Sequence, residues 1–120
     1  MEVSFYSLDN DNNKIIYKSE YKKINNTIIF KDKSLENTDL YITIENDHLV
    51  IKRVGQVTMT FKAKLKEITD GYYKNEMGLE FNFKVKTTSL ILKDNRIDLE
   101  YLMILDNEVI NSHKIWIIIR

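Results

Sequence analysis

Arg53 is the residue whose type and position point most directly to chemistry. It follows the odd-numbered alternation of Leu49, Ile51, Val57 and Met59, so in an extended chain it faces the same side as these apolar residues. A buried guanidinium needs a hydrogen-bonded or charged partner. A carboxylate or carbonyl of the protein would make Arg53 structural, whereas an open pocket would let its planar fork hold a carboxylate or phosphate. The sequence favours the structural interpretation, because structural ion pairs are common, and it leaves the ligand interpretation open.

Thr87 and Tyr101 are two further polar residues on inward-facing positions of their segments. Each could satisfy the guanidinium of Arg53 or line a pocket together with it. The three residues therefore form the candidate polar part of a binding site.

The motifs of common enzyme classes are missing. Phosphate-binding loops need clustered glycines, whereas Gly55, Gly71 and Gly78 are scattered, and no serine has a Gly-x-Ser-x-Gly setting. The absence of cysteine excludes disulfides, thiolate metal sites and thiol catalysis. His48 and His113 lie far apart without metal-ligand spacing, and we expect both to be ordinary surface or edge residues, with His48 in a turn. We predict no metal site and no cofactor. The sequence shows no catalytic constellation and leans against an enzyme, which stays open as a third hypothesis.

Acidic residues crowd the last third of the chain, where paired carboxylates could do acid–base work. Asp98 and Glu100 share the polar side of one alternating segment, opposite an apolar row. That arrangement is typical of a solvated face.

The charges of the chain are balanced, with 18 Lys plus Arg, 18 Asp plus Glu and a pI near 6.7. This balance excludes a globally basic nucleic-acid binder. Lys84 and Lys86 alternate with Phe81 and Phe83, so rings and charges fall on opposite faces, whereas single-stranded nucleic acid needs them on one face. We expect no nucleic-acid partner. The outward lysines remain available for protein contacts, and a homo-oligomer is compatible with the sequence.

Short extended segments must position these residues. The chain has no proline and only three glycines, so Asn and Asp carry most of the turns. Between the turns, Ile, Val, Tyr, Phe and Thr alternate with polar residues over 40–45, 79–86, 96–105 and 115–119. Helical spacing is rare, and only Lys62 to Thr69 could form a helical turn. The pattern predicts one all-β domain over residues 1–120, an antiparallel barrel of about eight or more strands.

Two irregularities are expected within these segments. The alternation from Leu49 to Ala63 continues through Gly55, which predicts one long strand that bends at the glycine. After Val85 the apolar positions change parity, which predicts a bulge near Thr87-Thr88.

No stretch approaches the ~18 consecutive apolar residues of a transmembrane helix. The first residues also lack the basic and apolar regions of a signal peptide. We therefore expect a cytoplasmic protein without membrane contact.

From residue 51 onward the chain carries short motifs in a fixed order: Arg53-x-Gly55-x-x-x-Met59-x-Phe61, Tyr73-x-x-x-x-Gly78, Thr87 and Leu99-x-Tyr101-x-Leu. This series resembles the YwiB-like family of bacterial β-barrels, from about residue 13 to the end of the chain. The resemblance implies a calycin-type barrel, similar to lipocalins and streptavidin, and no established activity.

Together these observations predict a protein that binds a small molecule, anionic or apolar, inside a calycin-like barrel without catalysis. The candidate ligand-binding residues are Arg53, Thr87, Tyr101 and Tyr73, and the structural residues are Gly55, Met59, Phe61 and Gly78. The alternative is a protein-interaction or assembly module that uses the outer sheet face and has a filled interior.

Overall fold

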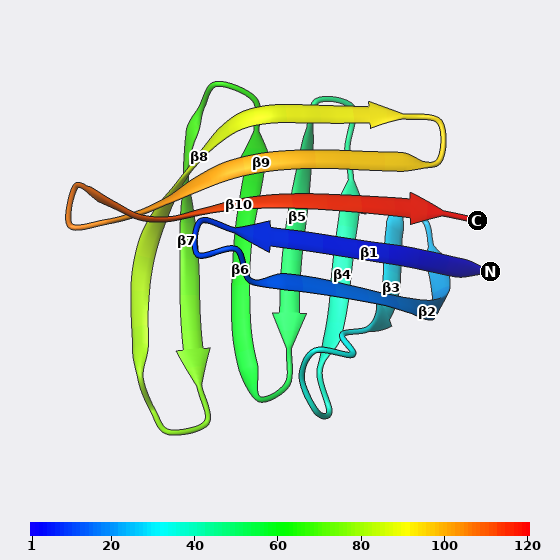
Figure 1. Cartoon of the computed structure of the whole chain (residues 1–120), viewed down its shortest axis with the longest axis horizontal. Coiled ribbons are helices and arrows are strands. Elements are labelled where there is room, and N and C mark those ends of the chain that lie inside the picture. The colour runs from blue at the N-terminus through cyan, green and yellow to red at the C-terminus, as the bar shows by residue number, and fades with distance from the viewer.

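Ten antiparallel strands form a closed barrel in the structure, a computed structural model that describes residues 1–120. The strands are β1 (Glu2–Asp9), β2 (Lys14–Ile24), β3 (Thr27–Lys31), β4 (Asp39–Ile44), β5 (His48–Val54), β6 (Val57–Lys64), β7 (Ile68–Asn75), β8 (Glu80–Lys93), β9 (Arg96–Leu105) and β10 (Glu108–Ile119). Each strand pairs with the next along the chain (Figure 1). The predicted all-β fold and antiparallel barrel are confirmed. The chain contains no helix long and apolar enough to cross a membrane.

The pairing of β1 with β10 closes the barrel. Their register runs from Val3 opposite Ile119 to Asp9 opposite His113. The backbone N–H of Arg120 donates to the carbonyl of Glu2 at 2.8 Å, and the two ends of the chain lie side by side in Figure 1. Because β1 and β10 pair, the sheet has no free edge strand.

Asparagine and aspartate carry the turns, as the sequence predicts. Asn12, Asn25 and Asp94 have φ angles of 61°, 55° and 54° in the turns β1–β2, β2–β3 and β8–β9. Asn and Asp tolerate this left-handed region better than other residues with a Cβ atom. They therefore connect the strands of a chain that has only three glycines.

Gly55 lies in the hairpin turn between β5 and β6, so the prediction of one strand bending at this residue is wrong. Arg53 pairs with Met59 across the hairpin, and Ile51 pairs with Phe61. The residues in these pairs are all odd-numbered. The apolar residues therefore stay at odd positions through the hairpin turn, as they would in a single bent strand. A Cβ atom at position 55 would lie 2.6 Å from the Cα of Thr38, so this turn needs a glycine.

The predicted helical turn between Lys62 and Thr69 is also wrong. The first three of these residues belong to β6, the last two belong to β7, and a tight turn joins the strands. Lys66 has a φ of 67° in this turn, and the N–H of Glu67 donates to the carbonyl of Lys64 at 3.1 Å.

The predicted bulge in β8 is confirmed. The pairing of β8 with β9 shifts between Thr87 and Ser89. The extra residue exchanges the two faces of the strand, which returns Leu90 and Leu92 to the core side of the sheet.

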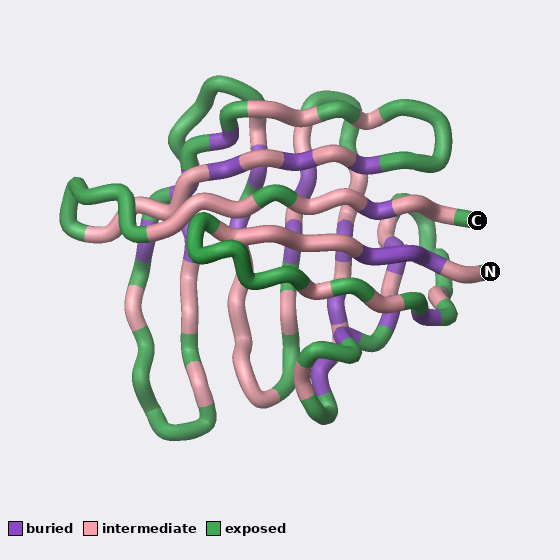
Figure 2. The backbone as a smooth tube through the Cα atoms, viewed as in Figure 1, coloured by how far each residue is buried: buried purple, intermediate pink, exposed green.

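The core fills one end of the barrel. Val3, Ile28, Leu49, Ala63 and Ile97 lie near the ends of their strands on this side and are at most 2% exposed. Buried residues alternate with intermediate or exposed ones along β3, β4, β5, β8 and β9 (Figure 2). The buried cluster of the whole barrel has sixteen hydrophobic residues and extends from this end along the interior toward the other. The other end of the barrel is built differently.

Candidate ligand-binding cavity

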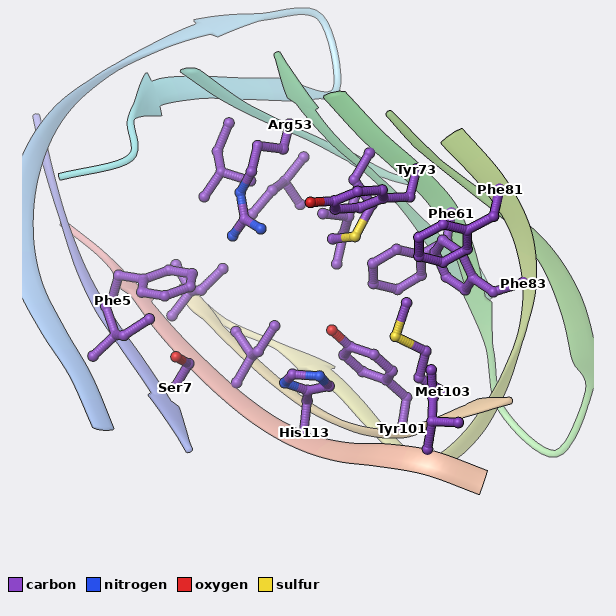
Figure 3. Close-up of a pocket in the computed structure, with 18 residues that line it drawn as sticks. Phe5, Ser7, Arg53, Phe61, Tyr73, Phe81, Phe83, Tyr101, Met103 and His113 are labelled. Atoms are coloured by element: carbon purple, nitrogen blue, oxygen red, sulfur yellow. The ribbon is translucent and has the colours of Figure 1, made fainter. Parts of the chain in front are cut away.

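A cavity of about 360 Å³ lies inside the barrel, toward the end where the odd-numbered strands finish and the even-numbered strands begin. Fifteen of its eighteen lining residues are hydrophobic. Most of the barrel contributes side chains (Figure 3). The lining residues are Phe5, Ser7, Ile15, Leu40, Ile42, Ile51, Arg53, Met59, Phe61, Tyr73, Phe81, Phe83, Tyr101, Met103, Ile110, His113, Ile115 and Ile117.

Arg53 reaches the cavity from the end of β5 and pairs with Asp32. Its Nε donates to Oδ2 of Asp32 at 2.8 Å, and the Asp32 side chain is only 1% exposed. The backbone N–H and the hydroxyl of Ser34 donate to the other oxygen of Asp32. The carboxylate is therefore fixed in place and holds one edge of the guanidinium.

The opposite edge of the Arg53 guanidinium faces the cavity. Figure 3 shows the two terminal nitrogens pointing toward the middle of the space between Phe5, Tyr73 and Tyr101. Neither nitrogen has a hydrogen-bond acceptor in the protein, because the single hydrogen bond of this side chain is the one from Nε. Two N–H-bearing nitrogens of a cation are thus left available inside an apolar cavity.

Tyr17 packs against Phe5 and lies close enough to Asp32 to be influenced by its charge. Its ring stacks on Phe5 with centroids 4.9 Å apart, and its buried hydroxyl has no hydrogen-bond partner. Burial raises the pKa of Tyr17 well above its ordinary value, and the negative charge of Asp32 adds to this effect. The Tyr17 hydroxyl therefore stays protonated and leaves Asp32 as the negative charge beside Arg53.

Two stacked ring pairs flank the guanidinium. The ring centroids of Tyr101 and His113 lie 5.0 Å apart at 23°, and those of Tyr73 and Phe81 lie 4.9 Å apart at 25°. Figure 3 shows the hydroxyl groups of Tyr73 and Tyr101 pointing into the cavity on the side of Arg53. Three strands, β5, β7 and β9, thus bring hydrogen-bond donors to one region.

Tyr101 and His113 beside Arg53 are uncharged near neutral pH. Burial raises the pKa of the Tyr101 hydroxyl, although the positive charge of Arg53 opposes the shift. Burial also lowers the pKa of His113, with Asp9 opposing the shift and Arg53 adding to it. The guanidinium is therefore the group that gives this part of the cavity its charge.

Ser7 and His113 both face the cavity, but no hydrogen bond joins them. An activated serine nucleophile needs such a bond to a general base. The carboxylates of Asp98 and Glu100 interact with Arg96 and Lys114 instead, at 2.9 Å and 3.4 Å. The arrangement in the cavity offers hydrogen-bond donors and apolar surface.

The structure gathers most of the predicted site around the cavity. Arg53, Tyr73, Tyr101, Met59 and Phe61 all line it.

Thr87, in contrast, is fully buried opposite Tyr101, does not line the cavity, and has no hydrogen-bond partner for its Oγ1. Gly55 and Gly78 lie in the turns β5–β6 and β7–β8 and do not line the cavity either. Neither Thr87 nor Tyr101 bonds the guanidinium of Arg53, whose single protein partner is Asp32.

Asp32 and His113 are the site residues that the sequence reasoning missed. His113 lines the cavity, so the expectation of an ordinary surface or edge histidine is wrong. Both residues extend alternating rows, because Asp32 follows Phe30 at a spacing of two and His113 precedes Ile115 at the same spacing. A residue two positions beyond the end of an alternating apolar series faces the same side of the strand. This rule would have identified both residues as inward-facing.

Comparisons with known proteins agree with this fold. The barrel is similar to the crystal structure of the ywiB protein from Bacillus subtilis, with a TM-score of 0.69 and 20% sequence identity. The match covers 97% of this chain and 87% of that chain. A search of curated proteins finds no match. Residues 5–117 match the family described as a domain of unknown function, DUF1934. With nearly its whole length matched, and with the YwiB-like barrel that its motifs predict, the chain belongs to the DUF1934 family.

Proposed function

We propose that this protein binds a small anionic molecule with an apolar body inside the barrel and does not transform it. One observation carries the proposal: the terminal nitrogens of Arg53 face an apolar cavity of about 360 Å³ without a protein acceptor. Ligand pockets are mostly apolar, with a few placed polar groups that orient the ligand. This cavity has that composition.

The size of the cavity supports the same proposal. It falls within the range of about 300–1,000 Å³ that small-molecule sites occupy. Unfilled volume in a core lowers stability by about 24 cal/mol per Å³ in measured cavity-forming variants. A void of this size is therefore unfavourable unless water or a ligand occupies it. The alternative function, an interaction module, was predicted with a filled interior, which this end of the barrel does not have.

Arg53 has a structural role as well, because Asp32 would be a buried, unpaired carboxylate without it. The two roles use different edges of the guanidinium and do not compete. A test of binding must therefore separate loss of the ligand contact from loss of the fold.

Native mass spectrometry of freshly purified protein is the first measurement, because it detects a co-purifying ligand and the oligomeric state together. Melting curves of the wild type with a panel of anionic amphiphiles follow. We expect a panel member to raise the melting temperature, and Arg53→Ala to weaken its binding by ~1.5–3 kcal/mol, as for a hydrogen bond to a charged group. Arg96→Ala is the matched control, since Arg96 also bonds a carboxylate through Nε but lies outside the cavity.

The double variant Arg53→Met/Asp32→Asn separates the two roles. It removes both charges while keeping similar side-chain volume, so the fold should tolerate it better than Arg53→Ala. We expect this variant to fold and to bind no panel member. Unchanged ligand binding by the folded double variant would exclude Arg53 as the anchor.

The calycin-type relationship and a cytoplasmic location complete the proposal. The first is supported by the meander of ten strands around an internal cavity, and the second by the absence of cysteine. The ligand is the partner that the proposal requires, while homo-oligomerisation is compatible with it.

A further inference from the structure

The charge around Arg53 limits the charge of a ligand. The guanidinium carries one positive charge, and the buried carboxylate of Asp32 already faces one of its edges. Tyr101 and His113 beside it are neutral, since burial disfavours their charged forms. Beside the opposite charges of Arg53 and Asp32, a monoanion adds one net negative charge and a dianion adds two, and each excess charge is costly in an apolar environment. The site therefore suits a single negative charge better than a double one.

The donors around this position suit a carboxylate. The free edge of the Arg53 guanidinium presents two nitrogens side by side, which matches the two oxygens of a carboxylate. The hydroxyl groups of Tyr73 and Tyr101 point into the same region from β7 and β9 (Figure 3). These hydroxyls can donate to the remaining lone pairs of the carboxylate oxygens.

The rest of the cavity suits aromatic rings. Phe61, Phe81 and Phe83 line the wall beyond the two tyrosines, and their centroids lie 6.2–6.4 Å from the neighbouring phenylalanine ring. Aromatic rings gain from offset or edge contacts at such distances. The filled core closes the other end of the barrel, so a long chain has no tunnel to follow. A cavity of about 150 Å³ holds one benzene, and the present volume of about 360 Å³ has room for about two rings.

We propose that the cavity takes a monocarboxylic acid with one or two aromatic rings, its carboxylate on the free edge of Arg53 and the hydroxyls of Tyr73 and Tyr101. This inference rests on the proposed function and names the ligand class of the same site. Arg53 selects the charge, the tyrosines select the carboxylate, and the phenylalanine wall selects the ring.

Isothermal titration calorimetry of the full chain with four probes tests the ligand class. The probes are 2-naphthoate, its neutral analogue 2-naphthamide, the dianionic 2-naphthyl phosphate, and octanoate, which has the carboxylate without the ring. We expect 2-naphthoate to bind at least about 10-fold more tightly than each of the other three. The amide lacks the negative charge, octanoate lacks the ring, and the phosphate brings a second negative charge into an apolar site.

Tyr73→Phe and Tyr101→Phe test the two hydroxyl groups with minimal change to packing. We expect each variant to weaken 2-naphthoate binding by about 10-fold or more and to leave 2-naphthamide binding less affected. Tyr72→Phe is the matched control, because Tyr72 lies next in sequence but bonds Glu80 at 2.7 Å outside the cavity. Equal effects of all three variants would overturn the role of the cavity hydroxyls.

The outcomes distinguish this inference from the proposed function. Tighter, Arg53-dependent binding of octanoate or 2-naphthyl phosphate would overturn the ring-acid class and leave the proposed function standing. Binding of none of the four probes would also overturn the class, and the native mass spectrum, which requires no choice of probe, would then decide the proposed function. Binding of 2-naphthoate that is unchanged in the folded Arg53→Met/Asp32→Asn variant would overturn both.

Discussion

Arg53 divides its hydrogen-bonding capacity between the protein and the cavity. Asp32 fixes the Nε edge, and Ser34 fixes Asp32 in turn. Because a carboxylate already orients the guanidinium, a ligand would meet a donor edge that needs little rearrangement, which reduces the entropic cost of binding. The same carboxylate weakens the positive potential that a ligand experiences. Asp32 therefore lowers the attraction of Arg53 for a ligand anion but holds the guanidinium in a fixed orientation.

His113 makes the stability of the barrel depend on pH. Burial lowers its pKa in the folded state below the ordinary value of about 6.5, so near that pH the unfolded chain binds the proton more readily. Stability due to neutral His113 is present above about pH 6.5 and is lost as the pH falls below it. We expect urea titrations to show a smaller loss of unfolding free energy between about pH 7.5 and 5.5 in His113→Phe than in the wild type. Identical losses in both proteins would contradict this.

The residues that surround the guanidinium show how far sequence reasoning reaches at this scale. Alternation alone placed Arg53 and Tyr101 on the inside, and the structure puts both at the cavity. It could not identify Asp32 as the ionic partner, because Asp32 lies in the loop after β3 and meets β5 only through the register in which β3, β4 and β5 pair. Alternation shows which side of the sheet a residue faces. Only the assembled strands show which residues of other strands lie beside it.

The pairing of Gly71 with Phe83 links the packing of β7 against β8 to the wall of the cavity. They are opposite each other in β7 and β8, and a Cβ atom at position 71 would lie 2.8 Å from Cδ2 of the Phe83 ring. The ring is 3% exposed and has little room to move except toward the cavity. We expect Gly71→Ala to lower the unfolding free energy by ~1–3 kcal/mol through overpacking, measured by urea denaturation.

A double-mutant cycle isolates this contact. In a Phe83→Leu background the smaller side chain should relieve most of the clash, so Gly71→Ala should cost less there than in the wild type. Gly78→Ala is the control, because a Cβ atom at Gly78 meets open space and its φ of 87° gives only a backbone penalty of ~1 kcal/mol. Equal costs of Gly71→Ala in both backgrounds would exclude the ring contact.

The bulge in β8 could be predicted from the sequence, whereas the turn at Gly55 could not. The bulge in β8 reverses the apolar alternation, so the order of residue types is enough to reveal it. The turn at Gly55 preserves the alternation, because Arg53 and Met59 pair across it with equal parity. A bend and a hairpin then give the same sequence pattern, and only the antiparallel pairing of β5 with β6 distinguishes them.

At the scale of the whole molecule, the adjacent chain ends predict that the barrel tolerates a new order of its strands. Arg120 donates its backbone N–H to Glu2, so a short Gly/Ser linker can join the two ends. We expect a circular permutant that begins at Asp47 and ends at Asn46, both exposed in the β4–β5 turn, to fold with the cavity retained. Circular dichroism and the ligand titration check this. A permutant that folds but no longer binds a ligand of the wild type would contradict it.

The pairing of β1 with β10, the seam of the barrel, also affects the order in which the strands pair during folding. Every other pairing joins strands that follow each other in the chain, whereas Val3 meets Ile119 from the opposite end. Closing so long a loop has the largest entropic cost, so hairpins can form early and the seam is the last contact to form. Until then β1 and β10 are free edges that other chains can pair with. His113 and Ile115 of β10 also wall the cavity, so the cavity is complete only after the final closure, and a ligand that needs the whole cavity could not guide the earlier steps.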